Sequence, residues 1–212
     1  MVVIGLTGKI ASGKSTVSGI LKDLGAEIID GDDIGREIVR QGSPTWKAIR
    51  REFGDGILMP DGSIDRRKLG ALVFSRPEEL RKLNRLTHPE IKRVVAGGIE
   101  QARSRPGGPP PVVVVDAAVL LEAGMDDLVD EVWVVTVDRE TQLRRLMARD
   151  GMPREAALAR IESQASVARP IRPEHVIIDN TDSPGDLARR VRSLWDSLID
   201  RLYREERRGL EI

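Results

Sequence analysis

Residues 8–15, which read Gly-Lys-Ile-Ala-Ser-Gly-Lys-Ser, constrain the fold of this chain more than any other stretch. They match the pattern G-x-x-x-x-G-K-S/T, follow a mainly apolar run at residues 2–6 and precede a helical pattern at residues 16–24. In a strand–loop–helix unit of this kind, backbone N–H groups and the helix N-terminus surround phosphate oxygens. The Lys14 ammonium is then expected to reach the β- and γ-phosphates, and the Ser15 hydroxyl to bind Mg²⁺. A glycine turn that only joins a strand to a helix is the structural alternative, but the four fixed positions and their context favour nucleotide phosphate binding.

Composition limits the class of protein further. A chain of 212 residues is long enough for one α/β domain with insertions or for two small domains. Basic and acidic residues balance at 34 each, which does not indicate nucleic acid or an anionic membrane as a partner. Cysteine is absent and no apolar run approaches the roughly 18 residues of a membrane span. We therefore expect a soluble, cytoplasmic protein that is a monomer or a weak homo-oligomer.

The apolar runs predict an α/β fold. Strands are expected at residues 2–6, 26–29, 112–115, 131–137 and 175–178, with helical patterns between them. The run at residues 112–115 is four valines ended by Asp116, which is typical of a buried parallel strand with an acid at its tip. Asp116 is the natural Walker B candidate, able to act on the Mg²⁺ shell or to hold a neighbouring group. The pattern predicts a three-layer P-loop fold with a five-stranded parallel sheet, which P-loop ATPases, GTPases and nucleotide kinases share.

The region between the second and third strands has no strand pattern. Helices are expected at residues 34–40, with Asp33 as N-cap, and at residues 65–74, with Asp65 as N-cap. A further helix from about residue 77 is expected to be disturbed at Pro89. This helical insertion could carry a substrate.

An arginine-rich helix pair follows the fourth strand, at residues 139–150 and 154–167, with a hinge at residues 151–153. Arg145 and Arg149 share one helix face, and Arg160 shares a face with Gln164. Such a pair is typical of a lid whose arginines close over a polyphosphate, although two amphipathic surface helices explain the spacing equally well. We expect three regions: a core at residues 1–31, 112–138 and 168–212, an acceptor-binding region at residues 32–111 and a lid at residues 139–167.

The combined order of these stretches resembles the dephospho-coenzyme A kinase family along nearly the whole chain. The matching stretches are residues 4–8 and 12–16, Leu24-Gly25, residues 29–32 with Arg36, Asp61-Gly62, residues 65–67 with Leu69, Val73-Phe74, Leu83-Asn84, Thr87-His88-Pro89, residues 121–124, Gln142-Leu143, Arg145-Leu146, Arg149, Arg160-Ile161, Gln164 and residues 178–180. The Asp-x-Asp after the second strand and the His-Pro stretch are more particular than the glycine loop. The resemblance implies ATP- and Mg²⁺-dependent phosphorylation of the ribose 3′-hydroxyl of dephospho-CoA, the last step of coenzyme A synthesis.

The resemblance also implies site residues. The ATP contacts would be Gly8, Lys9, Ile10, Ala11, Ser12, Gly13, Lys14, Ser15 and Thr16, with Asn180 beside adenine and Ser15 on the metal. The acceptor contacts would be Arg36, Arg66, His88, Asp116 and Arg160. Asp32 would accept the proton of the acceptor hydroxyl, and Lys14, Arg145 and Arg149 would complete the catalytic set.

Three stretches depart from the family pattern. Lys9 and Ala11 stand where the family often has glycine, at variable positions of the loop. Residues 117–122 lack the proline that usually precedes the Leu-Leu pair, and residues 166–173, with two prolines, replace a commonly charged stretch.

The sequence contains two histidines and leaves two other functions open. His88 precedes a proline in a helical region and is expected to bind rather than to act as acid or base; His175 begins a strand and is expected to be structural. Another P-loop small-molecule kinase, such as a nucleoside or nucleotide kinase, is the first alternative. A GTPase-type switch is the second, but residues 179–182 read Asp-Asn-Thr-Asp and lack an N-K-x-D guanine-reading motif.

Overall fold

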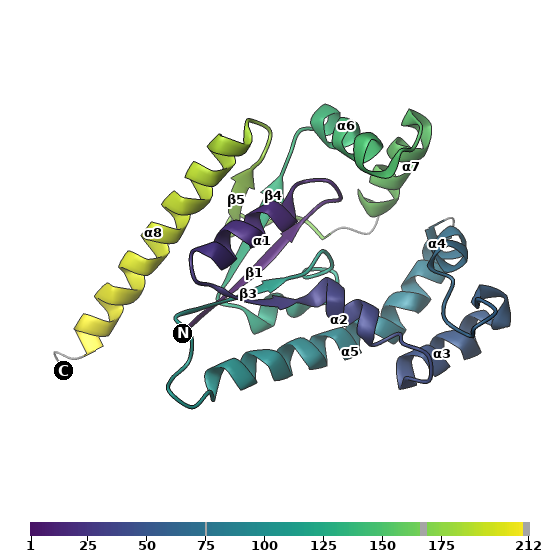
Figure 1. Cartoon of the computed structure of the whole chain (residues 1–212), viewed down its shortest axis with the longest axis horizontal. Helices are drawn as coiled ribbons and strands as arrows, with labels where there is room; N and C mark the ends of the chain where they lie inside the picture. The colour runs from purple at the N-terminus through teal and green to yellow at the C-terminus, as the bar shows by residue number, and fades with distance from the viewer. Residues whose placement is uncertain (75, 166–168, 210–212) are drawn as a thin grey trace.

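The structure of the chain is a computed structural model that describes residues 1–74, 76–165 and 169–209 (Figure 1). The expected boundary between lid and core at residues 167 and 168, and the first residues of the stretch at 166–173, lie outside the described residues, as does Ser75. Among the described residues, no helix has the length and apolar character needed to cross a bilayer.

A single parallel sheet forms the centre of the fold. Its strands are β1 (Val2–Gly8), β2 (Glu27–Asp30), β3 (Val112–Asp116), β4 (Glu131–Thr136) and β5 (Val176–Asp179), in the order β2-β3-β1-β4-β5. Every neighbouring pair is parallel, and Asp116 lies opposite Leu6 on one side and Asp30 on the other. The carboxyl ends of three strands therefore meet at one edge of the sheet. The predicted α/β fold and all five predicted strands are confirmed.

Helices cover both faces of the sheet and extend beyond it. They are α1 (Lys14–Asp23), α2 (Gly31–Glu37), α3 (Pro44–Phe53), α4 (Arg66–Phe74), α5 (Pro77–Arg103), α6 (Arg139–Asp150), α7 (Arg154–Ala165) and α8 (Pro184–Gly209), with short 3₁₀ turns at Asp55–Ile57 and Met125–Leu128. Helices α1 and α8 pack together on one face, and α5 covers the other, as Figure 1 shows.

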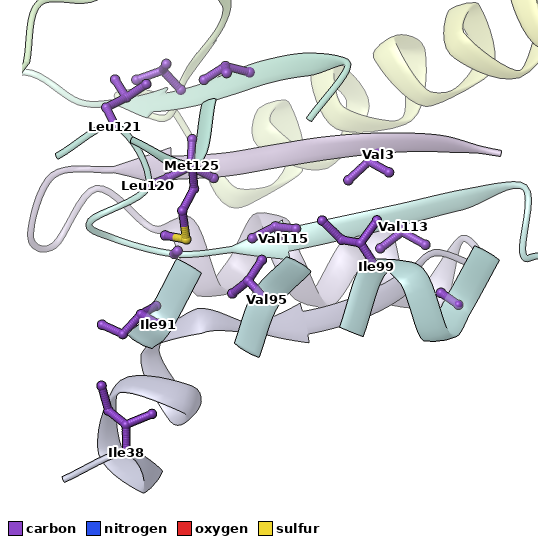
Figure 2. Packing of buried hydrophobic residues seen from close by; sticks show 14 residues of the cluster. Val3, Ile38, Ile91, Val95, Ile99, Val113, Val115, Leu120, Leu121 and Met125 are labelled. Carbon is purple, nitrogen blue, oxygen red and sulfur yellow. The ribbon is translucent and has the colours of Figure 1, made fainter. Parts of the chain in front are cut away.

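Two hydrophobic clusters separate the three layers. Val113 and Val115 point toward α5, where they meet Ile91, Val95 and Ile99 (Figure 2). The alternate residues of the same strand, Val112 and Val114, belong to the cluster under α1 and α8. Because successive side chains of a strand point to opposite faces, a strand of four valines is buried on both sides.

Helix α2 begins earlier than the sequence predicts. Its N-cap is Asp30, whose carboxylate accepts a 2.7 Å hydrogen bond from the backbone N–H of Asp33. The expectation that Asp33 caps a helix starting at residue 34 was therefore wrong. The chain turns from strand to helix within one residue, so Asp32 lies in the first helical turn beside the sheet edge.

Helix α5 runs without a break through Pro89 over 27 residues, so the expected disturbance at this proline was also wrong. Proline at this position removes one backbone hydrogen bond and costs about 3 kcal/mol in an isolated helix. The buried side chains of Ile91, Val95 and Ile99 contribute roughly 1.5–3 kcal/mol each. Packing of α5 on the sheet thus outweighs the tendency of Pro89 to break the helix.

The insertion and the helix pair each have a small core of their own. Ile49, Leu69 and Leu80 are among the buried residues shared by α3, α4 and the start of α5. Leu143, Leu146, Ala157 and Ile161 form the core between α6 and α7. In Figure 1 both regions lie on the same side of the molecule, with α7 above α4.

Candidate active site

The loop between β1 and α1 has the shape that its sequence predicts. A Cβ atom at Gly8 would lie 2.6 Å from Ser12 Oγ and 2.8 Å from the carbonyl oxygen of Val135, so no side chain fits there. Gly13 is the N-cap of α1 and has a φ of +92°, in the region that favours glycine. The helix therefore begins directly at Lys14 with its N-terminus beside the loop, where it favours anions.

Lys14 connects two carboxylates at the edge of the sheet. Its Nζ lies 2.8 Å from Asp32 Oδ2 and also contacts Asp116 Oδ1. The second oxygen of Asp32 accepts a hydrogen bond of 3.1 Å from the backbone N–H of Ala118. Burial by itself lowers the pKa of Lys14, but the hydrogen bonds and charges of Asp116 and Asp32 outweigh it and raise this pKa above its ordinary value. The ammonium group is therefore charged at any physiological pH.

A cavity of about 1160 Å³ lies in front of this cluster. Its wall is built by the glycine loop, by α4 and α5, by the segment after β3, and by α6 and α7. The predicted site residues on its wall are those at positions 8–15 of the loop, Asp32, Arg66, His88, Arg145, Arg149 and Arg160. This volume exceeds the roughly 300–1,000 Å³ of common small-molecule pockets, which suits a site for two substrates at once.

Four predicted residues lie outside the wall of the cavity. Arg36 pairs with Asp33 on the exposed side of α2. Asp116 is buried behind Lys14, and Thr16 is exposed on α1. Asn180 is buried behind the loop. The roles expected for these residues stay predictions.

Two buried polar atoms at the cavity have no hydrogen-bond partner within the described part of the chain. They are Ser12 Oγ and Arg145 Nη1. Both residues line the cavity. Buried polar atoms are normally paired, and a guanidinium group without an anion is costly to bury. An anionic ligand with several acceptor oxygens would supply the missing partners.

The other two arginines predicted for the lid share one carboxylate. Arg149 Nε lies 2.7 Å from Asp150, and Arg160 Nη1 lies 2.8 Å from the same side chain. Asp150 thereby joins the end of α6 to α7 across the hinge at residues 151–153. The two guanidinium groups are held at the cavity, where a polyphosphate could replace Asp150 as their partner.

His88 and Glu122 both line the cavity, and they lie next to each other there. Burial lowers the pKa of His88, and this effect outweighs the hydrogen bond of its ring to the backbone of Glu122. Burial also raises the pKa of the Glu122 carboxyl. The role expected for His88 in binding the acceptor stays a prediction. His175 is buried and accepts a 3.2 Å hydrogen bond from the backbone N–H of Arg172.

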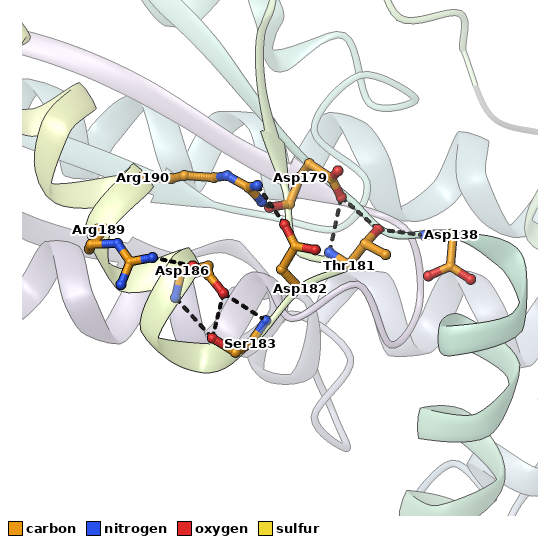
Figure 3. A network of polar contacts seen from close by, with 8 residues as sticks. All are labelled: Asp138, Asp179, Thr181, Asp182, Ser183, Asp186, Arg189 and Arg190. Atoms are coloured by element: carbon orange, nitrogen blue, oxygen red, sulfur yellow. Dashed lines mark hydrogen bonds and ion pairs between the residues drawn. The ribbon is translucent and has the colours of Figure 1, made fainter.

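The turn after β5 is tied down by a polar network (Figure 3). The Asp179 carboxylate accepts hydrogen bonds from the backbone and hydroxyl of Thr181, at 3.0 and 2.7 Å. The Thr181 hydroxyl in turn accepts from the backbone N–H of Asp138, which is the N-cap of α6. Arg190 donates to the carbonyl oxygen of Asp179 at 2.6 Å. The network fixes the backbone that carries Asn180.

Asn180 supports the glycine loop from behind. Its Nδ2 donates a buried 2.7 Å hydrogen bond to the carbonyl oxygen of Ser12. A Cβ atom at Gly13 would lie only 2.1 Å from that nitrogen, so the amide occupies the space that glycine leaves open. The sequence suggested Asn180 only as a neighbour of adenine and did not indicate this contact.

Two glutamines of the helix pair α6 and α7 also contact the glycine loop, and the sequence assigned them no role. Gln142 donates to the carbonyl oxygen of Ile10 at 2.8 Å, and Gln164 accepts from its N–H at 2.7 Å. The only signals in the sequence were their place in the resemblance and the helix face that Gln164 shares with Arg160.

The fold and the site together define a P-loop kinase of small molecules. The sheet is parallel and carries a glycine loop, Lys14 lies between two carboxylates, and an arginine-bearing helix pair lines the same cavity. Comparison with known proteins gives the family. The family model described as "Dephospho-CoA kinase" matches residues 2–185, and the chain belongs to the dephospho-CoA kinase family.

Relatives and solved structures agree with this assignment. The dephospho-CoA kinase of Geobacter sulfurreducens is 48% identical over 195 residues, which cover 92% of this chain and 98% of the relative. The dephospho-CoA kinase of Symbiobacterium thermophilum is 46% identical over 195 residues, which cover 92% of this chain and 80% of the relative. Among solved structures, TT1252 from Thermus thermophilus has a TM-score of 0.70 at 30% identity, covering 93% of this chain and 97% of that one. The dephospho-CoA kinase from Campylobacter jejuni has a TM-score of 0.64 at 28% identity, covering 92% and 96%.

Proposed function

We propose that this chain transfers the γ-phosphoryl group of ATP to the ribose 3′-hydroxyl of dephospho-CoA and so makes coenzyme A. The observation that carries the proposal is the single cavity in which the glycine loop, Asp32 and basic residues of both the insertion and the lid face one another. Membership of the dephospho-CoA kinase family supports the choice of acceptor.

The triphosphate is expected on the glycine loop. The backbone N–H groups of residues 13–15, the N-terminus of α1 and the Lys14 ammonium offer hydrogen-bond donors and positive potential at one place. In-line transfer then needs the acceptor hydroxyl opposite the bond between the γ-phosphorus and the β,γ-bridging oxygen. The basic residues of the insertion, Arg66 and His88, lie on the wall where the acceptor would enter, with Arg36 as a further expected contact.

Asp32 is the group that takes the proton. Its carboxylate lies on the cavity wall, and one oxygen is fixed by the backbone of Ala118. When Lys14 turns to the phosphates, the other oxygen becomes free to accept the hydroxyl proton. The hydroxyl oxygen forms a bond to the γ-phosphorus, the bond from that phosphorus to the bridging oxygen breaks, and ADP leaves with the electron pair. Asp116 keeps Lys14 at the sheet edge during this exchange.

The site suits Mg²⁺ held together with the nucleotide. The Ser15 hydroxyl is exposed on the cavity wall, and the carboxylates nearby offer hard oxygen ligands. The described residues contain no cluster of three or more acidic or histidine side chains able to hold a metal by themselves, so phosphate oxygens and water would complete the shell. When bound, the ion would neutralise charge on the phosphates.

The lid arginines Arg145, Arg149 and Arg160 are expected to neutralise the charge that builds up on the transferred group. We keep the division into core, acceptor-binding region and lid, which is supported by the separate small cores of the insertion and of α6 with α7. The balanced charge and the absence of cysteine support a cytoplasmic enzyme without nucleic-acid or membrane partners. The expectation that it works as a monomer or weak homo-oligomer stays a prediction.

One assay tests the proposal. Purified protein is incubated with ATP, Mg²⁺ and dephospho-CoA, while ADP release is followed and the product is weighed by mass spectrometry. We expect ADP release and a gain of one phosphate on dephospho-CoA, with much lower turnover on a panel of nucleosides and nucleotides. Turnover of a nucleoside in preference to dephospho-CoA would favour the alternative kinase, and GTP hydrolysis without use of dephospho-CoA would favour a switch protein.

A further inference from the structure

Both backbone groups of one loop residue, Ile10, are hydrogen-bonded to the lid. Gln142 on α6 donates to its carbonyl oxygen at 2.8 Å, and its N–H donates to Gln164 on α7 at 2.7 Å. The partners are 132 and 154 residues away in sequence. The tip of the glycine loop is therefore fixed by two helices of the lid.

Side chains strengthen this contact. Ile10 and Ala11 pack against the core between α6 and α7, which consists of Leu143, Leu146, Ala157 and Ile161. Ala11 has a φ of +58°, a left-handed conformation that a residue other than glycine adopts at a cost. Packing and hydrogen bonds at Ile10 oppose the relaxation of this backbone. Gln142 is buried, with only 4% of its surface exposed, so its amide has little freedom to move.

The two glutamines also share helix faces with the lid arginines. Gln142 precedes Arg145 by three residues on α6, and Gln164 follows Arg160 by four residues on α7. Residues at these spacings lie one above the other on a helix. Fixing each glutamine to the loop therefore fixes the rotation of its helix and the direction in which its arginine points.

We propose that Gln142 and Gln164 are positioning residues that latch the lid to the tip of the glycine loop through Ile10. The latch holds the loop in its phosphate-binding shape and keeps Arg145 and Arg160 directed at the same cavity. A ligand that orders the loop thereby orders the lid, and the coupling is reciprocal. The kinetic part of this inference rests on the proposed function, whereas its structural part does not.

The chemistry of the two bonds provides matched variants. Gln164 uses its oxygen as an acceptor, so Gln164→Glu keeps the bond to the Ile10 N–H and Gln164→Met removes it. Gln142 uses its nitrogen as a donor, so Gln142→Glu sets a carboxylate against the Ile10 carbonyl oxygen. Gln101, exposed on α5, provides the control substitutions Gln101→Met and Gln101→Glu.

The first measurement is amide hydrogen exchange at Ile10 and along α6 and α7, without ligands. In Gln164→Met, we expect the Ile10 amide to exchange about tenfold faster or more, while Gln164→Glu and both Gln101 variants keep the wild-type rate. In Gln142→Glu, faster exchange is expected in both the loop and the start of α6. An unchanged Ile10 amide in Gln164→Met would overturn the latch, as would equal rates in Gln164→Met and Gln164→Glu.

The second measurement separates positioning from a general loss of structure. With folding checked by circular dichroism, Gln164→Met is expected to raise the KM for ATP at least fivefold while the KM for dephospho-CoA changes less than twofold. Equal increases in both KM values, or no change in either, would contradict the proposal. If Gln142→Glu does not fold, the half-buried Gln164 still provides the pair of variants. A wild-type protein inactive on dephospho-CoA would refute the proposed function, yet the exchange experiment would still decide the latch.

Discussion

The Lys14 ammonium lies 2.8 Å from the Asp32 carboxylate and also contacts Asp116, so one cation joins the ends of three strands. Lys14 is nearly buried, whereas the Asp32 side chain is 38% exposed toward the cavity. The two residues are thus arranged so that binding of a triphosphate can separate them. The lysine would move to phosphate, and the aspartate would become available to the acceptor.

Replacing Asp32 by asparagine should separate binding from chemistry. Asp32→Asn removes the proton acceptor but keeps the side-chain volume and the hydrogen bond from Ala118. We expect kcat to fall about 10²-fold or more, the usual scale for a positioned general base, while ATP affinity measured by calorimetry changes little. Asp23→Asn, on the exposed end of α1, is the matched control. Turnover of dephospho-CoA by Asp32→Asn at the wild-type rate would show that another group accepts the proton.

Gly13 should not tolerate even a methyl group. A Cβ atom there would lie 2.1 Å from Asn180 Nδ2, and the backbone φ of +92° is strained for alanine. We expect Gly13→Ala to lower the free energy of unfolding by about 1–3 kcal/mol and to abolish measurable ATP binding. The control is Gly19→Ala in the same helix, because no atom lies within 4 Å of its would-be Cβ. That change should be neutral or stabilising by up to about 1 kcal/mol in urea titrations. Equal losses in the two variants would contradict the close fit.

Arg145 should be more important for activity than for stability. Its Nη1 is buried with no partner in the described structure, so Arg145→Met removes a costly unpaired group. We expect an equal or higher Tm together with a loss of kcat/KM of about 10²-fold or more. Arg144→Met serves as control, because Arg144 is exposed on the same helix, where it hydrogen-bonds to Thr141 and lies near the charge of Asp138. A fall in Tm without a fall in activity would assign Arg145 a structural role.

His88 should make stability depend on pH. Burial lowers its pKa in the folded protein below the ordinary value of about 6.5, so the unfolded chain binds the proton first as pH falls. The contribution of neutral His88 to the free energy of unfolding is fully present above about pH 6.5. It declines as the pH falls from there through the lower pKa of the folded state. The pKa of the Glu122 carboxyl is raised, so this group favours the folded state as the pH falls, which is opposite to the effect of His88. The effect of His88 is therefore obtained by comparing wild type with a His88 variant.

The measurement for His88 is the free energy of unfolding at several pH values. Relative to wild type, His88→Gln should lose less stability between pH 7.5 and 5. Parallel pH profiles for the two proteins would show that burial of His88 does not affect its titration.

Much of the fold could be predicted because its signals are local. Four consecutive valines at residues 112–115 indicate a strand buried on both faces, and the glycine loop indicates a strand before it and a helix after it. Element ends were less predictable: Asp30, not Asp33, caps α2, and Pro89 lies inside α5. At such points local alternatives differ by only a few kcal/mol, and packing against the sheet decides among them.

The structure brings most, but not all, of the predicted site residues together at one cavity. Asp32, Lys14, Arg66, His88 and the lid arginines share one cavity, as their chemistry suggested. Arg36 instead pairs with its neighbour Asp33. Residue type and spacing identify candidates for anion binding, but they do not reveal which charged neighbour a given arginine will choose.

By itself, the amino-acid sequence determined the phosphate-binding loop and the order of strands and helices, because each depends on residues close together in the chain. It also determined the family, because the order of these local motifs along the chain is particular to it. Only the tertiary structure decided what holds that loop in place. Gln142, Gln164 and Asn180 reach it across 132, 154 and 168 residues. Hydrogen bonds to main-chain groups place few demands on the partner's position in sequence, so these contacts appear only when the parallel sheet brings the segments together.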